Sequence, residues 1–178
     1  MTDDILDTAA DAALALAAER PWGEVSLRDV AERAGLPFPE LYAAAPGKSR
    51  LVLAISRRLD RAALETAATP SDDAHDRLFD AAMARIEAME PHRAALVSMA
   101  RAENPLALAA HFPLTARAIL EAAGVSATAP RLAAMTFVWG RIAQVWRDDE
   151  GALNRTMAEI DKRLKQMRER LGRLGAGF

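Results

Sequence analysis

Apolar residues recur every three or four positions through most of this sequence, and no stretch alternates β-branched and polar residues for long enough to form a sheet. Alanine, which has the highest helix propensity and lets helices pack closely, is abundant throughout. The chain has 178 residues, of which 51% are apolar, so it can bury a core as one compact domain or as a small head on a larger body. The pattern predicts an all-α protein.

Turn and capping residues divide this periodicity into helices. Ser26 is suited to cap a short helix that Gly35 ends in a left-handed conformation, and Pro113 should kink or split a later helix. The helices are predicted at residues 5–19, 26–34, 37–45, 49–67, 75–90, 91–101, 106–123, 130–148 and 152–171. We expect residues 69–73 to form a linker between an N-terminal head, 1–68, and a C-terminal body, 69–178. Residues 172–178 should fray.

The spacing within residues 27–44 is typical of a helix-turn-helix. Ala31 provides the small side chain needed where the second helix crosses the first, and Gly35, four residues later, tolerates a positive φ. The positions that should seal the two helices together are apolar: Val30, Ala34, Leu36 and Leu41.

A wider set of segments resembles the DNA-binding head of the TetR family, over roughly residues 5–60. These segments are Ile5–Ala10, Val25–Ala31, Ala34–Leu36, Leu41–Tyr42, Gly47–Lys48 and Leu51. The resemblance implies an N-terminal three-helix head and a helical body that dimerises through its last two helices and binds a small ligand. The family positions that approach double-stranded DNA correspond here to Ser26, Arg28, Pro37, Phe38, Tyr42 and Lys48. Lys48 and the Tyr42 hydroxyl are suited to hold phosphates.

The second helix of the motif departs from the family pattern because it has no basic residue. Glu40 is its one charged residue, and it would repel phosphate. Ala43 and Ala44 stand where polar contacts are usual, and an alanine methyl cannot read a base edge by hydrogen bonding. The leader, with Asp3 and Asp4, provides no basic arm. The remaining positive candidates are Arg28, Arg33, Lys48, Arg50, Arg57 and Arg58.

Several helices of the predicted body carry large apolar side chains. Such side chains ordinarily form the core, and here they also suggest a ligand pocket. The predicted pocket residues are Met83, Met99, Phe112, Met135, Phe137 and Trp139. Methionine adapts to irregular space, and the interruption at Pro113 favours a gap between helices. Small residues at Ala133, Ala134, Gly140 and Ala143 would let helices of two subunits approach closely.

The body also resembles the COQ9 family, whose members share the TetR fold, bind lipid and assist ubiquinone biosynthesis. The matching segments are Asp76–Asp80, Pro91–Arg93, Val145–Asp149 and Thr156–Asp161. This resemblance implies an alternative function, a lipid-binding accessory protein with a vestigial head. It would explain a motif helix that lacks DNA-reading side chains.

Other classes of protein find little support in the sequence. There is no cysteine, so disulfides, thiol catalysis and cysteine-bound zinc are excluded. His75, His92 and His111 have no partner at helical metal-binding spacing, and no nucleophile-elbow, zinc-protease or P-loop pattern occurs. We therefore predict no enzyme, no metal and no cofactor.

Neither a signal peptide nor a run of membrane-spanning length is found, so we expect a cytoplasmic protein. With a net charge of −2, any DNA-binding surface must be local. The lysines and arginines of residues 162–173 are interleaved with Glu159, Asp161 and Glu169 on the same predicted helix, which favours a solvated helix over a membrane or acidic-partner surface. Together these observations predict a homodimeric transcriptional regulator whose head binds operator DNA and whose body responds to an apolar small molecule.

Overall fold

A computed structural model describes residues 2–68, 71–149 and 152–178, and within them all regular secondary structure is helical. The α-helices are α1 (Thr2–Glu19), α2 (Leu27–Ala34), α3 (Phe38–Ala44), α4 (Lys48–Glu65), α5 (Ala74–Met89), α6 (Arg93–Ala102), α7 (Pro105–Ala109), α8 (Phe112–Ala122), α9 (Ala129–Arg147) and α10 (Asn154–Arg173). Three short 3-10 helices join them: η1 (Trp22–Glu24), η2 (Thr66–Ala68) and η3 (Glu90–His92). The all-α prediction is confirmed. Thr69 and Pro70 of the predicted linker, and Glu150 and Gly151, lie outside the described residues.

The predicted helix break at Pro113 is confirmed. Pro113 splits the segment predicted at 106–123 into α7 and α8, and it occupies the first turn of α8, where its missing N–H costs no hydrogen bond. Gly124, with φ +66°, follows α8 in the left-handed conformation.

The described residues form two compact units that differ from the predicted halves. Unit 1 contains residues 1–58 and 91–108, and unit 2 contains residues 59–90 and 109–178. The difference has two causes: α4 is one continuous helix that passes from the first unit into the second, and α6 packs against α1 and η1. Helical periodicity reveals that α6 is amphipathic but not which helices it packs on.

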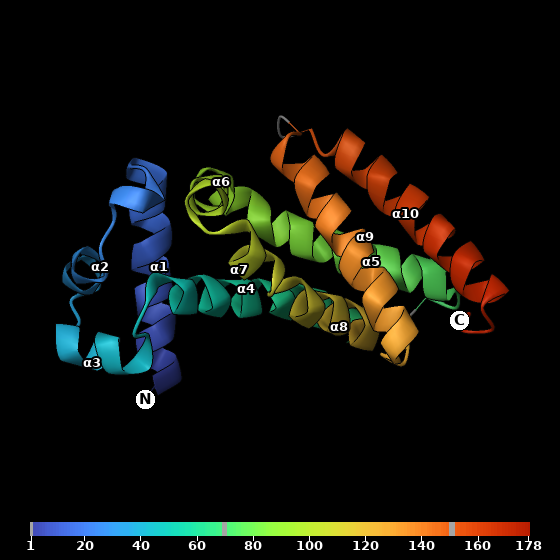
Figure 1. Cartoon of the computed structure of the whole chain (residues 1–178), viewed down its shortest axis with the longest axis horizontal. Helices are drawn as coiled ribbons and strands as arrows, with labels where there is room; N and C mark the ends of the chain where they lie inside the picture. Colours follow the sequence, from blue (N-terminus) through green and yellow to red (C-terminus); the bar gives the residue numbers. More distant parts are fainter. Residues whose placement is uncertain (1, 69–70, 150–151) are drawn as a thin grey trace. The chain divides into compact units, whose positions relative to one another are not determined.

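The core of unit 1 lies where α1 meets α2, α3 and α6. α1 contributes closely packed small side chains, such as Ala9 and Ala13, and η1 contributes the fully buried Trp22. Leu41 of α3 and Leu51 of α4 are also completely buried. Figure 1 shows α1, α2 and α3 of this unit in blue and cyan.

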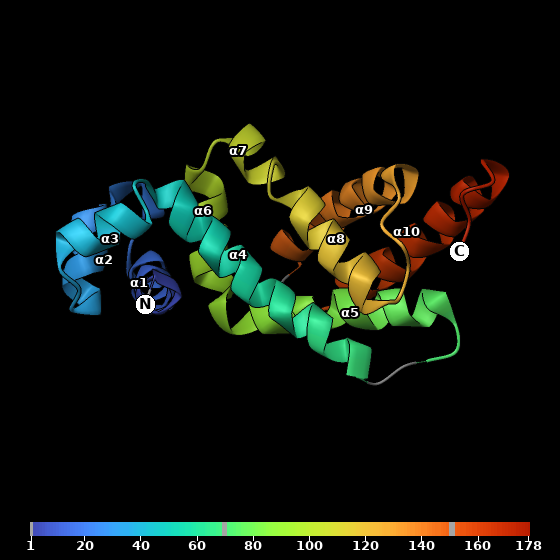
Figure 2. The same ribbon diagram turned by 90° about the horizontal axis from the view of Figure 1, so that it is seen from below.

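In unit 2, α9 packs between α8 and α10, and α5 packs on both α8 and α10. Figure 1 shows α9 and α10 side by side, and Figure 2 shows α8 along α9. The apolar residues at the centre of this unit are Leu78, Ile86, Ile119, Leu120, Met135, Ile142, Ile160 and Leu164. Within the part of the chain that the structure describes, no helix is both long and apolar enough to cross a bilayer.

A buried polar cluster joins four elements of unit 2. The Arg85 Nε donates to Asp60 Oδ1 at 2.6 Å, and the Thr115 hydroxyl donates to the same oxygen at 2.9 Å. The Arg85 guanidinium also lies over the Trp139 ring, 4.5 Å from its centroid. Asp60 and Arg85 are only 6% and 4% exposed, so the charge of Asp60 is compensated by Arg85 in a site with little access to water. Burial lowers the pKa of Arg85, and the neighbouring Asp60 opposes that shift.

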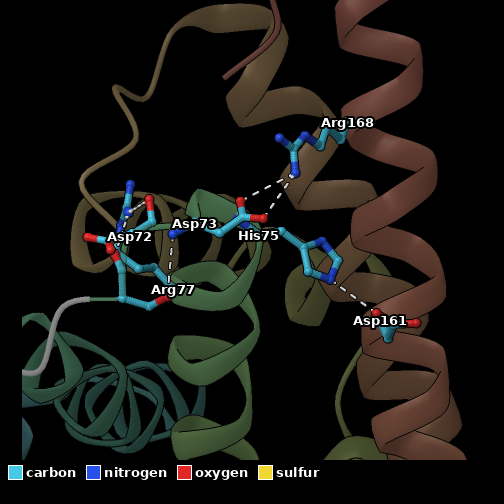
Figure 3. Close-up of polar contacts among 7 residues, drawn as sticks. Asp72, Asp73, His75, Arg77, Asp161 and Arg168 are labelled. Carbon is cyan, nitrogen blue, oxygen red and sulfur yellow. Dashed lines mark hydrogen bonds and ion pairs between the residues drawn. The ribbon is translucent and has the colours of Figure 1, made fainter.

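Polar contacts also fasten the start of α5 to α10 (Figure 3). His75 Nε2 lies 3.1 Å from Asp161 Oδ1, and Arg168 Nη1 lies 3.3 Å from Asp73 Oδ1. Asp73 also caps α5 by accepting a hydrogen bond from the backbone N–H of His75. Hydrogen bonds with His75 and Arg168 lower the pKa of Asp73, and those with Lys165 and His75 lower the pKa of Asp161.

These contacts predict a loss of stability in acid. Because the pKa of Asp73 and that of Asp161 are lower in the folded state, their stabilisation is complete above the unfolded-state value of about 3.9 and disappears as pH falls below it. Urea unfolding between pH 6 and pH 3 should therefore show a falling free energy of unfolding below about pH 4. Asp73→Asn with Asp161→Asn should flatten that fall. An unchanged profile in the double variant would contradict the assignment.

The end of the chain is more ordered than predicted. α10 continues to Arg173, and the Arg131 Nε donates to the Ala176 carbonyl at 3.0 Å. The Ala176 N–H in turn donates to Leu171 O at 2.9 Å. The expected fraying of residues 172–178 is thus opposed by an arginine of α9, which the glycine-rich composition of this tail did not indicate.

Candidate nucleic-acid interface

The helix-turn-helix of α2 and α3 is built as the sequence predicted. The Ser26 Oγ accepts a hydrogen bond from the Asp29 N–H at 3.1 Å, and Asp29 Oδ2 accepts one from the Ser26 N–H at 2.8 Å. This reciprocal capping box lowers the pKa of Asp29 and fixes the start of α2. Gly35 follows α2 with φ +64°, so the left-handed C-cap is also confirmed.

α3 is anchored by one side chain and exposes most of the others. Leu41 is fully buried, with Val30 and Ala31 of α2. The exposed side chains of this segment are Pro37, Pro39, Glu40, Tyr42 and Ala43. As the sequence showed, this surface has no cation of its own.

A cation from α2 covers part of that surface. The Arg28 guanidinium lies 4.8 Å from the centroid of the half-buried Phe38 ring, and the Phe38 and Tyr42 rings are 6.0 Å apart at 49°. Tyr42 is 52% exposed. Three of the predicted DNA-binding residues, Arg28, Phe38 and Tyr42, are therefore side by side, and an arginine stacked in this way is held in place while its N–H groups still face outward.

Lys48 has an internal role that the sequence did not reveal. Its Nζ donates to the carbonyls of Trp22 and Val25 at 2.7 and 2.8 Å and lies over the Trp22 ring. Burial lowers its pKa, and Glu103 acts in the opposite direction. Two of its three N–H groups are thus committed to holding the turn between α1 and α2, which leaves one for a phosphate.

Replacing Lys48 with methionine should destabilise unit 1. The variant keeps the length of the side chain but loses two charge-assisted hydrogen bonds, and we expect the free energy of unfolding to fall by about 1–3 kcal/mol. Thermal unfolding at fixed protein concentration measures this. Tyr42→Phe, which removes only an exposed hydroxyl, is the control and should unfold like the wild type. Equal stability of all three proteins would contradict an internal role for Lys48.

Several other cations of this unit are paired with acids. Arg33 donates to both carboxylate oxygens of Glu19 at 2.8 and 2.7 Å, and Arg58 bonds Asp11 at 2.7 Å. Within residues 2–58 and 91–108, neither Arg28 nor Arg50 has a carboxylate partner within ion-pair distance. Arg28, Arg50 and Arg57 are exposed, and of these Arg28 lies within the motif and Arg50 in the first turn of α4, directly after it.

The packing of α6 on η1 could not be predicted from the sequence. The Trp22 N–H donates to the Ser98 Oγ at 2.9 Å, and its indole Nε1 lies 3.4 Å from Glu103 Oε1. Glu103 also accepts from the Ser49 hydroxyl at the start of α4. Side chains from α6 and the residue that follows it thus bind the same turn that Lys48 holds. The residues around Ser98 and Glu103 in the sequence do not indicate that these two polar side chains bind a distant turn.

The six predicted pocket residues are divided between the two units. Met99 belongs to unit 1, and the other five belong to unit 2. Met83, Met135 and Trp139 are buried, whereas Phe137 is 55% exposed on α9. A Cβ on Gly140 would lie 3.3 Å from the Phe112 ring, so this glycine accommodates an aromatic ring of its own chain. The described residues contain no group of three potential metal ligands.

Comparisons with known proteins find a family match in the N-terminal part of the chain and similar folds over most of its length. The model of bacterial regulatory proteins of the tetR family matches residues 9–55, which include α2 and α3. A TetR transcriptional regulator from Rhodococcus sp. RHA1 superimposes with a TM-score of 0.69 at 20% identity, covering 90% of this chain and 93% of that one. A tetR-family transcriptional regulator from Streptomyces coelicolor gives a TM-score of 0.60 at 19% identity, covering 97% and 82%.

No curated protein sequence matches the chain. The sequence match to the family model is confined to residues 9–55, where the capped, glycine-terminated α2 leads into α3 as a helix-turn-helix requires. The remaining helices agree with it in fold. Residues 9–55 thus match the tetR family of bacterial regulatory proteins, and the chain as a whole shares the fold of solved tetR-family regulators.

Proposed function

We propose that this protein is a dimeric transcriptional regulator that binds operator DNA through α2 and α3. The observation that supports this best is the intact helix-turn-helix, with its capping box and the contacts of Phe38 with the exposed Arg28 and Tyr42, within the segment that matches the family model. In such motifs the second helix enters the major groove while neighbouring groups hold the phosphates. No catalytic role is part of the proposal.

We propose that exposed cations make the phosphate contacts. Arg28 and Arg50 would hold the backbone, with the Ser26 and Tyr42 hydroxyls as further donors and Pro37 in van der Waals contact. Lys48 would contribute mainly by fixing the turn at Trp22 and Val25. Since Glu40 repels phosphate and few cations are available, non-specific affinity should be low.

The salt dependence of binding should reflect this small number of cations. If Arg28 and Arg50 of two heads each neutralise one phosphate, the slope of log K against log salt is about −3.6. Arg50→Ala should weaken binding to all duplexes equally and reduce the slope by about 1.8. Fluorescence anisotropy between 50 and 200 mM salt, about the range in which such contacts are lost, measures both values. An unchanged slope would exclude Arg50 from the interface.

The proposed dimer uses α9 and α10. Phe137 is a large aromatic side chain exposed on α9, and the small residue Ala133 lies one turn before it on the same exposed face. Exposed aromatics of this kind are enriched at interfaces, and a second copy of the chain would remove Phe137 from water. A dimer would present two heads to successive major grooves, about 34–36 Å apart.

We further propose that an apolar small molecule bound by the helices of unit 2 regulates DNA binding. The buried methionines Met83 and Met135 supply adaptable apolar surface there. α4 runs from Lys48, which holds the turn of unit 1, to Asp60, which belongs to the buried cluster of unit 2. A ligand that shifts this cluster would therefore act on a helix shared with the head.

A titration of purified protein against its own upstream region and a scrambled duplex, at two salt concentrations, tests the proposal. Tighter binding of the upstream region, weakened by Arg28→Ala, would support it. Equal and weak affinity for both duplexes at low salt, together with an isoprenoid or acyl lipid extracted from the purified protein, would instead support the COQ9-like accessory function.

A further inference from the structure

The surface that α3 would present to a major groove offers few hydrogen-bonding groups. Pro37 and Pro39 have no side-chain donor or acceptor and no backbone N–H, and Ala43 offers only a methyl group. Phe38 is half-buried, and its ring contacts both the Arg28 guanidinium and the Tyr42 ring. On α3, the polar groups left exposed are the Tyr42 hydroxyl and the Glu40 carboxylate.

Glu40 is available to a ligand. It is exposed, and its carboxylate makes no hydrogen bond or ion pair with any residue that the structure describes. Its neighbour on the same helix face is Ala43, three residues later, whose Cβ should lie about 5–6 Å away. An ionised carboxylate accepts hydrogen bonds and cannot donate them.

The groups that each base exposes in the major groove determine which bases Glu40 and Ala43 would favour. Guanine presents only acceptors there, N7 and O6, so it repels a carboxylate. Cytosine presents its N4 amino group and adenine its N6 amino group, and both donate to an acceptor. Thymine presents a 5-methyl group that packs against an alanine methyl. Tyr42, beside Phe38 and suited to a phosphate, adds no competing preference.

We propose that Glu40 is the main base-reading residue of this head, accepting a hydrogen bond from an exocyclic amino group of cytosine or adenine, and that Ala43 contacts a thymine methyl within one or two base steps of it. The proposal rests on the proposed DNA-binding function. Glu40 repels phosphate at every site, and only a site with the amino group offsets this cost by a hydrogen bond. The repulsion therefore favours specific over non-specific sites.

Selection of bound duplexes from a random pool by the full-length protein tests this. The wild type should enrich one cytosine or adenine position per half-site, with a preference over guanine of at least about fivefold, and a thymine beside it. Glu40→Ala should reduce that preference to about onefold and bind scrambled duplex more tightly. Glu40→Gln should move the position towards adenine, whose N6 and N7 groups suit an amide.

Glu32→Gln is the matched control because Glu32 is an exposed acid of α2, outside the proposed reading face. It loses the same charge and should leave the selected bases unchanged. Replacing the neighbouring thymine with deoxyuridine removes only the methyl group and should weaken wild-type binding about threefold to fourfold. Circular dichroism checks that each variant folds.

The outcomes separate the two proposals. Sequence-selective binding whose preferred bases are the same in wild type, Glu40→Ala and Glu40→Gln would overturn the assignment of Glu40 and leave the regulator function intact. Enrichment of guanine at the position that changes in the Glu40 variants would also overturn it. Absence of any enriched duplex would overturn both.

Discussion

Phe137→Asp is expected to convert the dimer to a monomer and to weaken operator binding by about a hundredfold or more. Phe137 is 55% exposed on α9, so the substitution should not disturb the core of its own chain. In the proposed dimer, however, it would place a charge in an apolar interface. Two linked heads bind far more tightly than one, so loss of the dimer removes that gain.

Analytical ultracentrifugation measures the first effect and an anisotropy titration measures the second. Leu106→Asp is the control, because Leu106 is an exposed apolar side chain of unit 1, outside α9 and α10. It should remain dimeric. A dimeric Phe137→Asp protein with normal DNA affinity would show that the subunits associate through another surface.

Arg85→Met is expected to produce a large loss of stability. It removes the positive charge that compensates Asp60 and leaves that carboxylate buried, with the Thr115 hydroxyl still donating to it. Breaking a buried ion pair in this way costs about 3–5 kcal/mol. Urea unfolding at fixed protein concentration should show this loss in the free energy of unfolding.

The double variant Asp60→Leu with Arg85→Met tests whether the loss comes from the unpaired charge. Because both charged groups are then replaced by apolar ones of similar size, most of the lost stability should return. A double variant that is as unstable as Arg85→Met alone would show that packing against Trp139, rather than charge compensation, accounts for the loss.

The sequence predicted the features of this fold that depend on neighbouring residues. The capping box between Ser26 and Asp29, the left-handed Gly35 and the break at Pro113 each follow from local backbone chemistry. The helix-turn-helix could be recognised because all its sealing positions fall within one short segment.

The features that sequence reasoning missed depend on long-range packing. Asp60 and Arg85 lie 25 positions apart, and neither has an unusual local context. Trp22 and Glu103 are 81 positions apart, so the packing of α6 in unit 1 had no local signal. The sequence also could not predict what Lys48 binds. Its side chain is long enough to reach either a phosphate or two internal carbonyls, and in the structure it binds the carbonyls.

The role of Lys48 determines how DNA binding should be tested. A Lys48 variant that loses DNA binding would not separate contact from folding, whereas Arg28 and Tyr42 are exposed and can be changed with less effect on the core. Arg28→Ala and Tyr42→Phe are therefore the informative variants for the interface.

Selection from a random-duplex pool by the full-length protein, followed by anisotropy titration of the enriched duplex, tests whether this protein binds operator DNA. We expect an enriched motif with two related half-sites about 10 base pairs apart, bound at least about a thousandfold more tightly than scrambled duplex. Arg28→Ala should bind that duplex more weakly. A pool that remains random after selection at low salt, with a correctly folded dimer, would contradict operator binding.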